Sequence, residues 1–133
     1  MVRQKKDKYT VFDGLEKQHV NGEEVKMAHN ANWVYMTASN REEAVKIGER
    51  LVESKLAACI NIFENMTSIF MWEGKLEQGT EVAFIAKTTA GKIPELVEAV
   101  KSMHSYDVPC IISLPVSDGN PDFINWISES VEG

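Results

Sequence analysis

Three segments of this chain are almost continuously apolar, and they constrain the fold more than any other feature. They are Ile69–Trp72, Val82–Ala86 and Cys110–Ile112, which we interpret as parts of strands. A strand with one solvated face alternates apolar and polar residues, and these strands do not. Both of their faces must therefore be covered, because an open sheet face of this kind would exceed the few hundred Å² typical of the largest apolar patch on a monomer.

The remaining patterns predict where strands and helices alternate. Ser39-Asn40-Arg41-Glu42 has the spacing of a capping box, Ala44, Ile47 and Leu51 follow with helical period, and Lys55 closes that helix. Expected strands are Trp33–Thr37, Cys59–Trp72 with a bulge at Glu64-Asn65, Glu81–Thr88 and Ile111–Val116, and two more helices are expected over Pro94–His104 and Pro121–Ser130. The order predicts an α+β, ferredoxin-like βαββαβ sandwich with a C-terminal helix.

Length and composition predict one domain preceded by an extension. The chain has 133 residues, which fits a single core. Residues 1–32 are polar with scattered apolar positions, so we expect a partly ordered N-terminal extension there, with a short strand at Tyr9–Phe12 and a turn at Asn21-Gly22. Residues 33–133 are expected to form the domain.

Charge and cysteine usage exclude several classes of protein. A net charge of −6 disfavours nucleic-acid binding, which needs clustered Lys and Arg. No apolar run approaches the length of a membrane span, no signal-peptide pattern is present at the start, and the two cysteines, Cys59 and Cys110, form no C-x-x-C pair. We therefore expect a cytoplasmic protein without membrane association.

The uncovered sheet face predicts self-association. In a βαββαβ fold both main helices lie on one face of the sheet, and copies of the same chain would cover the other. The alternative is that the N-terminal extension folds over that face.

Several runs in this order resemble the CutA family of divalent-cation tolerance proteins. They are Leu56–Ile62, Thr67–Lys75, Glu81-Val82, Lys87–Thr89, His104, Tyr106, Pro109, Leu114–Val116 and Phe123–Ile127. The resemblance covers Val34 to Ser130 and implies a tightly packed homotrimer linked to tolerance of copper and other divalent cations. We expect it to be non-enzymatic, with no required cofactor and with copper or another divalent cation as a ligand.

The chain departs from the family pattern where the family is proposed to hold copper. Met36 stands where the family commonly has Cys in the first strand, and Ser105 and Cys110 replace a Pro and a Glu around His104. Glu64-Asn65 replaces a Pro-Gly.

Soft side chains define a candidate metal site. Met36 or Met103, together with His104 and Cys110, offers the thioether, imidazole and thiolate ligands that favour Cu(I). The alternative is structural: Met103 packs in the core, Cys110 acts as a small apolar residue and His104 caps a helix C-terminus.

Polar residues at strand ends define a second candidate site. Trp72, Glu81, Lys87 and Tyr106 are expected to line an intersubunit cleft. By analogy with the PII signalling proteins, such a cleft would bind a small ligand, so a trimeric sensor is the alternative function. Structural ion pairs at an interface explain Glu81 and Lys87 equally well.

Two other classes share this element order. An RNA-recognition module needs stacking aromatics in its third strand, and Glu81–Lys87 holds one aromatic residue and no such motif. An acylphosphatase-like enzyme needs a phosphate cradle after its first strand, and Thr37–Arg41 supplies an arginine but no glycine.

Overall fold

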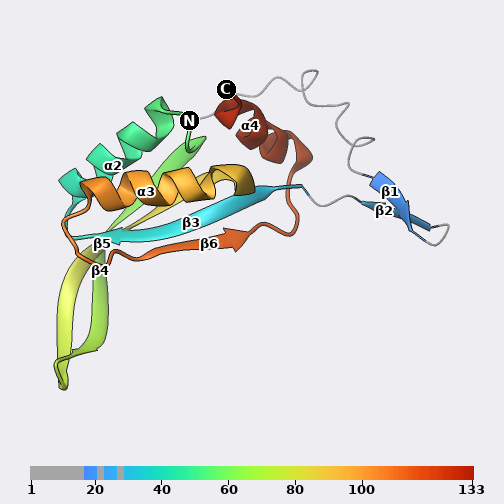
Figure 1. Cartoon of the computed structure of the whole chain (residues 1–133). Helices are drawn as coiled ribbons and strands as arrows, with labels where there is room; N and C mark the ends of the chain where they lie inside the picture. The colour runs from blue at the N-terminus through green and yellow to red at the C-terminus, as the bar shows by residue number, and fades with distance from the viewer. Residues whose placement is uncertain (1–16, 21–22, 27–28) are drawn as a thin grey trace.

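The computed structural model describes the backbone of residues 17–20, 23–26 and 29–133 (Figure 1). The predicted strand at Tyr9–Phe12 and the turn at Asn21-Gly22 lie outside the described residues. In chain order the elements are β1 (Lys17–Val20), β2 (Glu23–Lys26), β3 (Ala31–Ala38), α2 (Arg41–Glu53), β4 (Cys59–Trp72), β5 (Lys75–Thr89), a 3₁₀ turn (Ala90–Lys92), α3 (Ile93–Met103), β6 (Ile111–Pro115) and α4 (Pro121–Val131).

The predicted α+β fold is confirmed. Four antiparallel strands form one sheet in the order β4-β5-β3-β6, and β1 pairs with β2 in a separate two-stranded sheet. The helices α2 and α3 lie side by side on one face of the four-stranded sheet, and α4 packs at the end where β3 begins (Figure 1). This is the split βαβ arrangement of ferredoxin-like folds. Strand β3 begins at Ala31, two residues before the predicted domain boundary.

The core lies between the sheet and the helices α2 and α3. Val34, Met36 and Phe84 project from β3 and β5 onto Ile47, Leu51, Leu96 and Val100 of the two helices, and all of them are fully buried. The apolar residues of each helix recur with the helical period and form one stripe, as the sequence predicts.

The start of α2 differs from the prediction by one residue. The N-cap is Asn40, whose side-chain oxygen accepts from the Glu43 backbone N–H at 2.9 Å, whereas the sequence pattern placed Ser39 there with Glu42 as its partner. The Glu43 carboxylate reaches back and accepts from the backbone N–H of Ser39 at 3.1 Å. Asparagine is as good an N-cap residue as serine, so the spacing alone is compatible with an N-cap at Ser39 or at Asn40.

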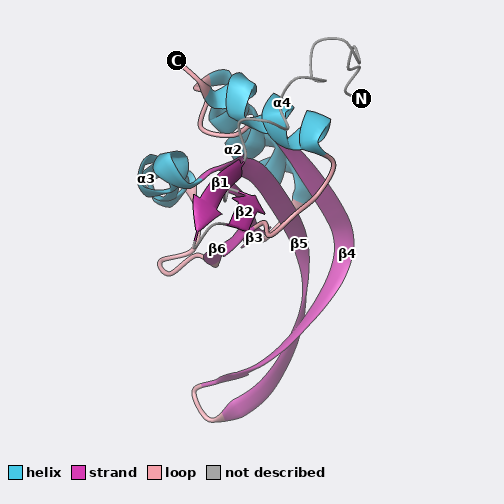
Figure 2. Cartoon of the chain, turned by 90° about the vertical axis from the view of Figure 1, so that its right-hand side faces the viewer, coloured by secondary structure: helices cyan, strands magenta, loops and turns pink. Residues whose placement is uncertain are grey.

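The β4–β5 hairpin extends beyond the body of the sheet as a curved arm (Figure 2). The predicted bulge is present, because the pairing register shifts between Phe63 and Met66, and Asn65 adopts a φ of 62°. The turn uses positive φ at Glu73 and Gly74, as a two-residue type I′ hairpin turn requires. Strand β5 begins at Lys75, six residues earlier than predicted, because tight pairing with β4 overrides the polar sequence there.

The face of the sheet away from α2 and α3 is apolar and largely open. Residues paired across strands share a face, and the row Trp33, Lys87 and Leu114 lies opposite the core. On this face Phe63 is 55% exposed, Ile112 54%, Leu114 51% and Trp33 42%. The expected two-sided apolar strands are therefore present, and one side is uncovered in the described chain.

Candidate functional site

A carboxylate in the middle of β5 gathers polar groups from three segments. The Tyr106 hydroxyl donates to Glu81 Oε2 at 2.7 Å, and the Ser68 hydroxyl of β4 donates to Oε1 at 2.5 Å. Cys110 lies close enough for the charge of Glu81 to act on its thiol. We call Ser68, Glu81, Tyr106 and Cys110 the Glu81 cluster. It joins β4, β5 and the loop between α3 and β6.

The surroundings in the Glu81 cluster raise the pKa of two of its acidic groups, Tyr106 and Cys110. Burial, followed by the hydrogen bond and the charge of Glu81, raises the pKa of Tyr106 to about 12. Burial and the same charge raise the pKa of the Cys110 thiol. Both groups are therefore protonated at neutral pH, so neither offers the thiolate or phenolate that a nucleophile or a metal ligand needs.

His104 is held in one tautomer beside this cluster. The Tyr106 backbone N–H donates to His104 Nδ1 at 3.1 Å, so the ring proton is on Nε2. That nitrogen donates to the Thr37 carbonyl at 2.7 Å, and the imidazole side chain is 0% exposed. His104 is the C-cap residue of α3, as one alternative expected, but its ring binds a strand carbonyl instead of the end of the helix.

Glu43 ties the start of α2 to the end of α3. Its Oε2 accepts from the Ser105 backbone N–H at 2.7 Å and lies 3.8 Å from His104 Nδ1. Burial raises the pKa of Glu43, but hydrogen bonds from Ser105 and Ser39 outweigh it and bring the pKa below its ordinary value. Glu43 is therefore ionised at neutral pH.

The predicted copper ligands occupy packed or hydrogen-bonded positions in the described chain. Met36 is 0% exposed in the core between β3 and the helices, and Met103 packs against that core. Both ring nitrogens of His104 are engaged, and the Cys110 thiol favours its protonated form. Across residues 29–133 no group of three His, Cys, Asp or Glu side chains is arranged to hold a metal ion. The copper site stays a prediction.

The four predicted cleft residues occupy three places in the structure. Glu81 and Tyr106 are hydrogen-bonded, as described. Trp72 lies at the tip of the hairpin arm and is 62% exposed. Lys87 lies near the opposite end of β5. Whether a second chain brings these three places together into one cleft stays a prediction.

Lys87 is buried in a hollow that the sequence did not reveal. The hollow has a volume of about 380 Å³ and lies between the sheet and the N-terminal part of α4. Lys87 Nζ donates to Asn61 Oδ1 and lies 6.0 Å from the ring centroid of Trp33 and 5.9 Å from that of Phe123. We call this the Lys87 hollow; its lining residues are Trp33, Lys87, Val116, Asp118, Gly119, Asn120, Phe123, Ile124 and Ile127.

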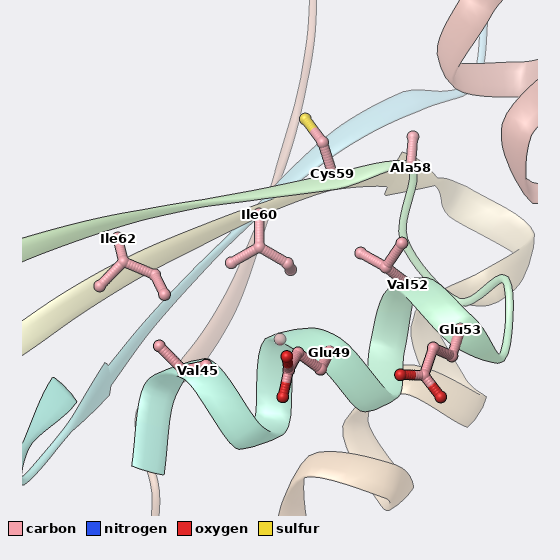
Figure 3. Close-up of a pocket in the computed structure, with 9 residues that line it drawn as sticks. Val45, Glu49, Val52, Glu53, Ala58, Cys59, Ile60 and Ile62 are labelled. Carbon is pink, nitrogen blue, oxygen red and sulfur yellow. The ribbon is translucent and has the colours of Figure 1, made fainter. Parts of the chain in front are cut away.

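A second hollow separates α2 from the edge strand β4 (Figure 3). Ile60 and Ile62 point from the strand toward the helix, whereas the Cys59 side chain points away from it (Figure 3). Val45 and Val52 line the helix side, and the carboxylates of Glu49 and Glu53 stand beside them. The residues that line this groove are mainly apolar, and they do not combine an acid, a base and a nucleophile. The groove therefore has the character of a packing surface and not of a catalytic site.

The arm carries the most exposed apolar side chains of the sheet. Ile69, Met71 and Leu76 are 66%, 63% and 72% exposed, and Met71 and Leu76 are paired across the hairpin and share a face. Phe70 and Trp72 lie on the other face of the arm, beside Glu77 and Lys75. An arm that is apolar on both faces is typical of a surface that another protein chain covers.

No helix in the described part of the chain has the length and apolarity needed to cross a membrane.

Comparison with known proteins extends over nearly all of the domain. Residues 32–130 match the model of the CutA1 divalent ion tolerance protein family. The chain is 50% identical over 101 residues to the divalent-cation tolerance protein CutA of Archaeoglobus fulgidus, covering 76% of this chain and 98% of that protein. It is 40% identical to the Thermus thermophilus protein, covering 73% of this chain and 94% of the relative. It spans 64% of the CutA homolog of Xenopus laevis.

Solved structures of such proteins have the same fold. The structure of the Archaeoglobus fulgidus protein, described as periplasmic, superposes with a TM-score of 0.74 over 77% of this chain and 99% of that one, at 50% identity. CutA1 of Ehrlichia chaffeensis gives a TM-score of 0.75 over 78% and 97%, at 36% identity. The resemblance in the sequence is thus confirmed, and the chain belongs to the CutA1 divalent ion tolerance family.

Proposed function

We propose that this protein acts in divalent-cation tolerance as a non-enzymatic homotrimer, with copper as the cation to which it responds. The observation that carries the proposal is the family match over residues 32–130, together with relatives named for divalent-cation tolerance. The fold and its apolar surfaces support self-assembly.

Self-assembly is supported by three features that a single chain leaves uncovered: the outer face of the sheet, the hairpin arm and the two edge strands. The outer face of the sheet exposes Trp33, Ile112 and Leu114, and the arm exposes Met71 and Leu76. The edge strands β4 and β6 are both unpaired on one side in the described chain. Free edges can pair with another chain, and head-to-tail pairing of two different edges gives a ring when the rotation between copies closes. A trimer is the ring that the family resemblance implies.

The soft side chains Met36, Met103, His104 and Cys110 support copper as the ligand by their chemistry. Their contacts set a condition on binding. His104 would have to give up the hydrogen bonds with Thr37 and Tyr106, and Cys110 would have to lose a proton that its surroundings retain. Copper binding at this place would therefore require the local structure to open.

A non-enzymatic role is supported by the Glu81 cluster. The hydroxyl of Tyr106 and the thiol of Cys110 are held in their protonated forms, which suits structural hydrogen bonding more than nucleophilic catalysis. A cytoplasmic location is part of the same proposal. The Archaeoglobus fulgidus protein is described as periplasmic and the Arabidopsis thaliana protein as chloroplastic, so cell fractionation is the test of location.

Native mass spectrometry of the purified chain tests the proposal, with copper added and after chelation. A trimer that binds a fixed number of copper ions per subunit, and loses them in His104→Ala and Cys110→Ser, would support it. Copper tolerance of cells with and without the gene gives the cellular readout. A trimer indifferent to copper would favour the alternative of a sensor with a ligand in its intersubunit clefts, and a monomer would contradict self-assembly.

A further inference from the structure

Two opposite charges on the outer face of β5 have no ion-pair partner in the described chain. Successive side chains of a strand alternate between its two faces, so Glu81 and Lys87 share a face with Ala83 and Ile85, which lie between them. Lys87 is paired with Trp33 of β3, which places this row on the face away from α2 and α3. None of the ion pairs within residues 29–133 includes Glu81 or Lys87.

The ammonium of Lys87 is buried among neutral groups. Its side chain is 9% exposed, and its Nζ donates to Asn61 Oδ1. The rings of Trp33 and Phe123 lie 6.0 and 5.9 Å from it, near the limit of cation–π attraction. An ammonium has three donors, so two remain for another acceptor. Because a buried charge with so few partners is costly, a carboxylate brought to Lys87 by another chain would stabilise it.

The carboxylate of Glu81 is held by neutral donors. The hydroxyls of Ser68 and Tyr106 donate to its two oxygens at 2.5 and 2.7 Å. These bonds orient the carboxylate but supply no positive charge. Each carboxylate oxygen has room for a further donor, so an ammonium can bind without displacing either hydroxyl.

The two charges cannot meet within one chain, because they lie about 20 Å apart at roughly 3.4 Å per residue of strand. Glu81 is paired with Met66 where the arm leaves the sheet, and Lys87 lies at the end of β5 against which α4 packs. In a ring of identical chains, each boundary joins one surface of a chain to a different surface of the next. One end of β5 can therefore face the opposite end of β5 in the neighbouring chain.

The shape of the chain suits such a contact. The arm bends away from α2 and α3, toward the side of the outer sheet face, and it begins beside Glu81 (Figure 1). The Lys87 hollow, with a volume of about 380 Å³, leaves room for a side chain from a second copy. Its walls include the apolar Phe123, Ile124 and Ile127, and an ion pair between apolar walls is stronger than one in water.

We propose that Lys87 forms an ion pair with Glu81 of the partner subunit, and that this pair recurs at every boundary of the homotrimer. Each chain supplies its carboxylate to one neighbour and its ammonium to the other, so the pair determines the head-to-tail register of the ring. The pair rests on the proposed self-assembly. Self-assembly does not rest on the pair, because the apolar surfaces of the sheet and the arm are present without it.

A double-mutant cycle with Glu81→Gln, Lys87→Met and the two combined tests the pair. Light scattering over a dilution series in urea gives the chain concentration at which half of the trimer has dissociated. Each single change leaves the opposite charge buried and should raise that concentration at least tenfold, whereas the combined change should raise it no further than the larger single effect. Residues this far apart in one chain have additive effects, so such coupling must arise between copies. Additive effects would overturn the proposal.

A matched control uses Lys46, which lies at an exposed position on α2. Lys46→Met removes the same charge as Lys87→Met does. Its effect on trimer dissociation should be small and should add to that of Glu81→Gln. Coupling of the same size in this control cycle would overturn the proposal, because it would show that net charge and not a specific contact is responsible.

Mixing the two single variants tests the contact between chains. A chain with Glu81→Gln keeps Lys87, and a chain with Lys87→Met keeps Glu81, so a mixed ring restores the pair at one boundary. Native mass spectrometry with one isotope-labelled variant should show more mixed trimers than random exchange gives. A random distribution would overturn the proposal.

A crystal structure of the parent chain decides the matter if Lys87→Met fails to fold. The nitrogen of Lys87 should lie within about 4 Å of the carboxylate of Glu81 of the partner subunit, the usual limit of an ion pair. A trimer in which these groups lie farther apart would overturn the pair and leave self-assembly intact. A parent chain that is monomeric in solution would overturn both.

Discussion

Tyr106 donates a 2.7 Å hydrogen bond to Oε2 of Glu81, and this bond fixes the loop after α3 against the middle of β5. Ser68 occupies the other carboxylate oxygen, so both oxygens of Glu81 have a partner within the chain. The backbone N–H of the same tyrosine binds His104. One residue therefore anchors the loop through its side chain and its main chain at once.

Replacing Tyr106 with Phe should lower the free energy of unfolding by about 1–3 kcal/mol, because it removes a hydrogen bond to a charged acceptor. Urea denaturation measures this loss. Tyr35→Phe is the control, since among the described residues the Tyr35 hydroxyl bonds only to the weak thioether acceptor of Met66, at 3.6 Å. An equal decrease in the free energy of unfolding in the two variants would show that the hydrogen bond to Glu81 adds no stability beyond that of the Tyr35 hydroxyl.

The ionisation of Tyr106 should be visible at high pH. Its pKa is raised from the ordinary value of 10.0 to about 12. The folded state therefore holds the proton more tightly than the unfolded state, and this stabilisation is fully present below pH 10.0 and is lost as the pH rises through about 12. Ultraviolet titration of tyrosinate should show Tyr106 ionising at high pH, and Glu81→Gln should lower the pKa of Tyr106 toward its ordinary value. If the pKa of Tyr106 is the same in Glu81→Gln as in the parent, Glu81 is not a cause of its raised value.

Glu43 should contribute to stability in the opposite pH range. Its folded-state pKa is below the ordinary value of 4.5, so its stabilisation is present above that pH and is lost as the pH falls through the folded pKa. Chemical denaturation at a series of acidic pH values should show a shallower loss in Glu43→Gln than in the parent. Glu42→Gln, one residue earlier in the same helical turn, is the matched control and should leave the slope unchanged.

The tautomer of His104 is open to direct measurement. Long-range proton–nitrogen correlation spectra should show the proton on Nε2, because Nδ1 accepts from the Tyr106 backbone. Added copper should leave these resonances in place unless the site opens. A proton on Nδ1 would contradict the described network, and loss of the resonances with copper would support the metal site.

Leu76→Glu should weaken self-assembly without unfolding the chain. The side chain is 72% exposed on the arm, so a charge there costs little in the isolated chain, but it would be buried if another copy covers the arm. Mass photometry over a dilution series gives the populations. Gln78→Glu is the comparison variant. It adds the same charge on the same face of the arm, at an exposed position paired with Ile69, but replaces a polar side chain instead of an apolar one. A parent chain that is monomeric at all concentrations would sink this prediction.

Local patterns predicted the helices and the order of elements well, because helical period, caps and turns are written into short segments. They placed the N-cap at Ser39 because Ser39 and Asn40 both stand three residues before a glutamate. They began β5 too late, since Leu76 is the one large apolar residue between Lys75 and Thr80. Pairing with β4, which is tertiary, extends the strand through that segment.

The candidate site was less accessible to sequence reasoning. Within one chain Glu81 and Tyr106 are hydrogen-bonded, whereas Lys87 and Trp72 lie at other places, and the cleft that would join all four between subunits stays a prediction. Trp33 and Phe123 were missed beside Lys87, since they are 90 residues apart in the chain. The link between Glu43 and Ser105 likewise needs α2 and α3 to be placed side by side before it can be seen.

The position of β3 in the middle of the sheet has a consequence for how the chain acquires its structure. β3 leaves the ribosome before either of its neighbours, and its partners Thr89 and Ile112 follow much later. Within the four-stranded sheet, only β4 and β5 are joined by a tight turn and can pair while synthesis continues. Closing the loops that bring β5 and then β6 to β3 carries an entropic cost, so refolding should be slow compared with that of a helical bundle of this length. A nascent chain stopped before β6 would present β3 with one side unpaired.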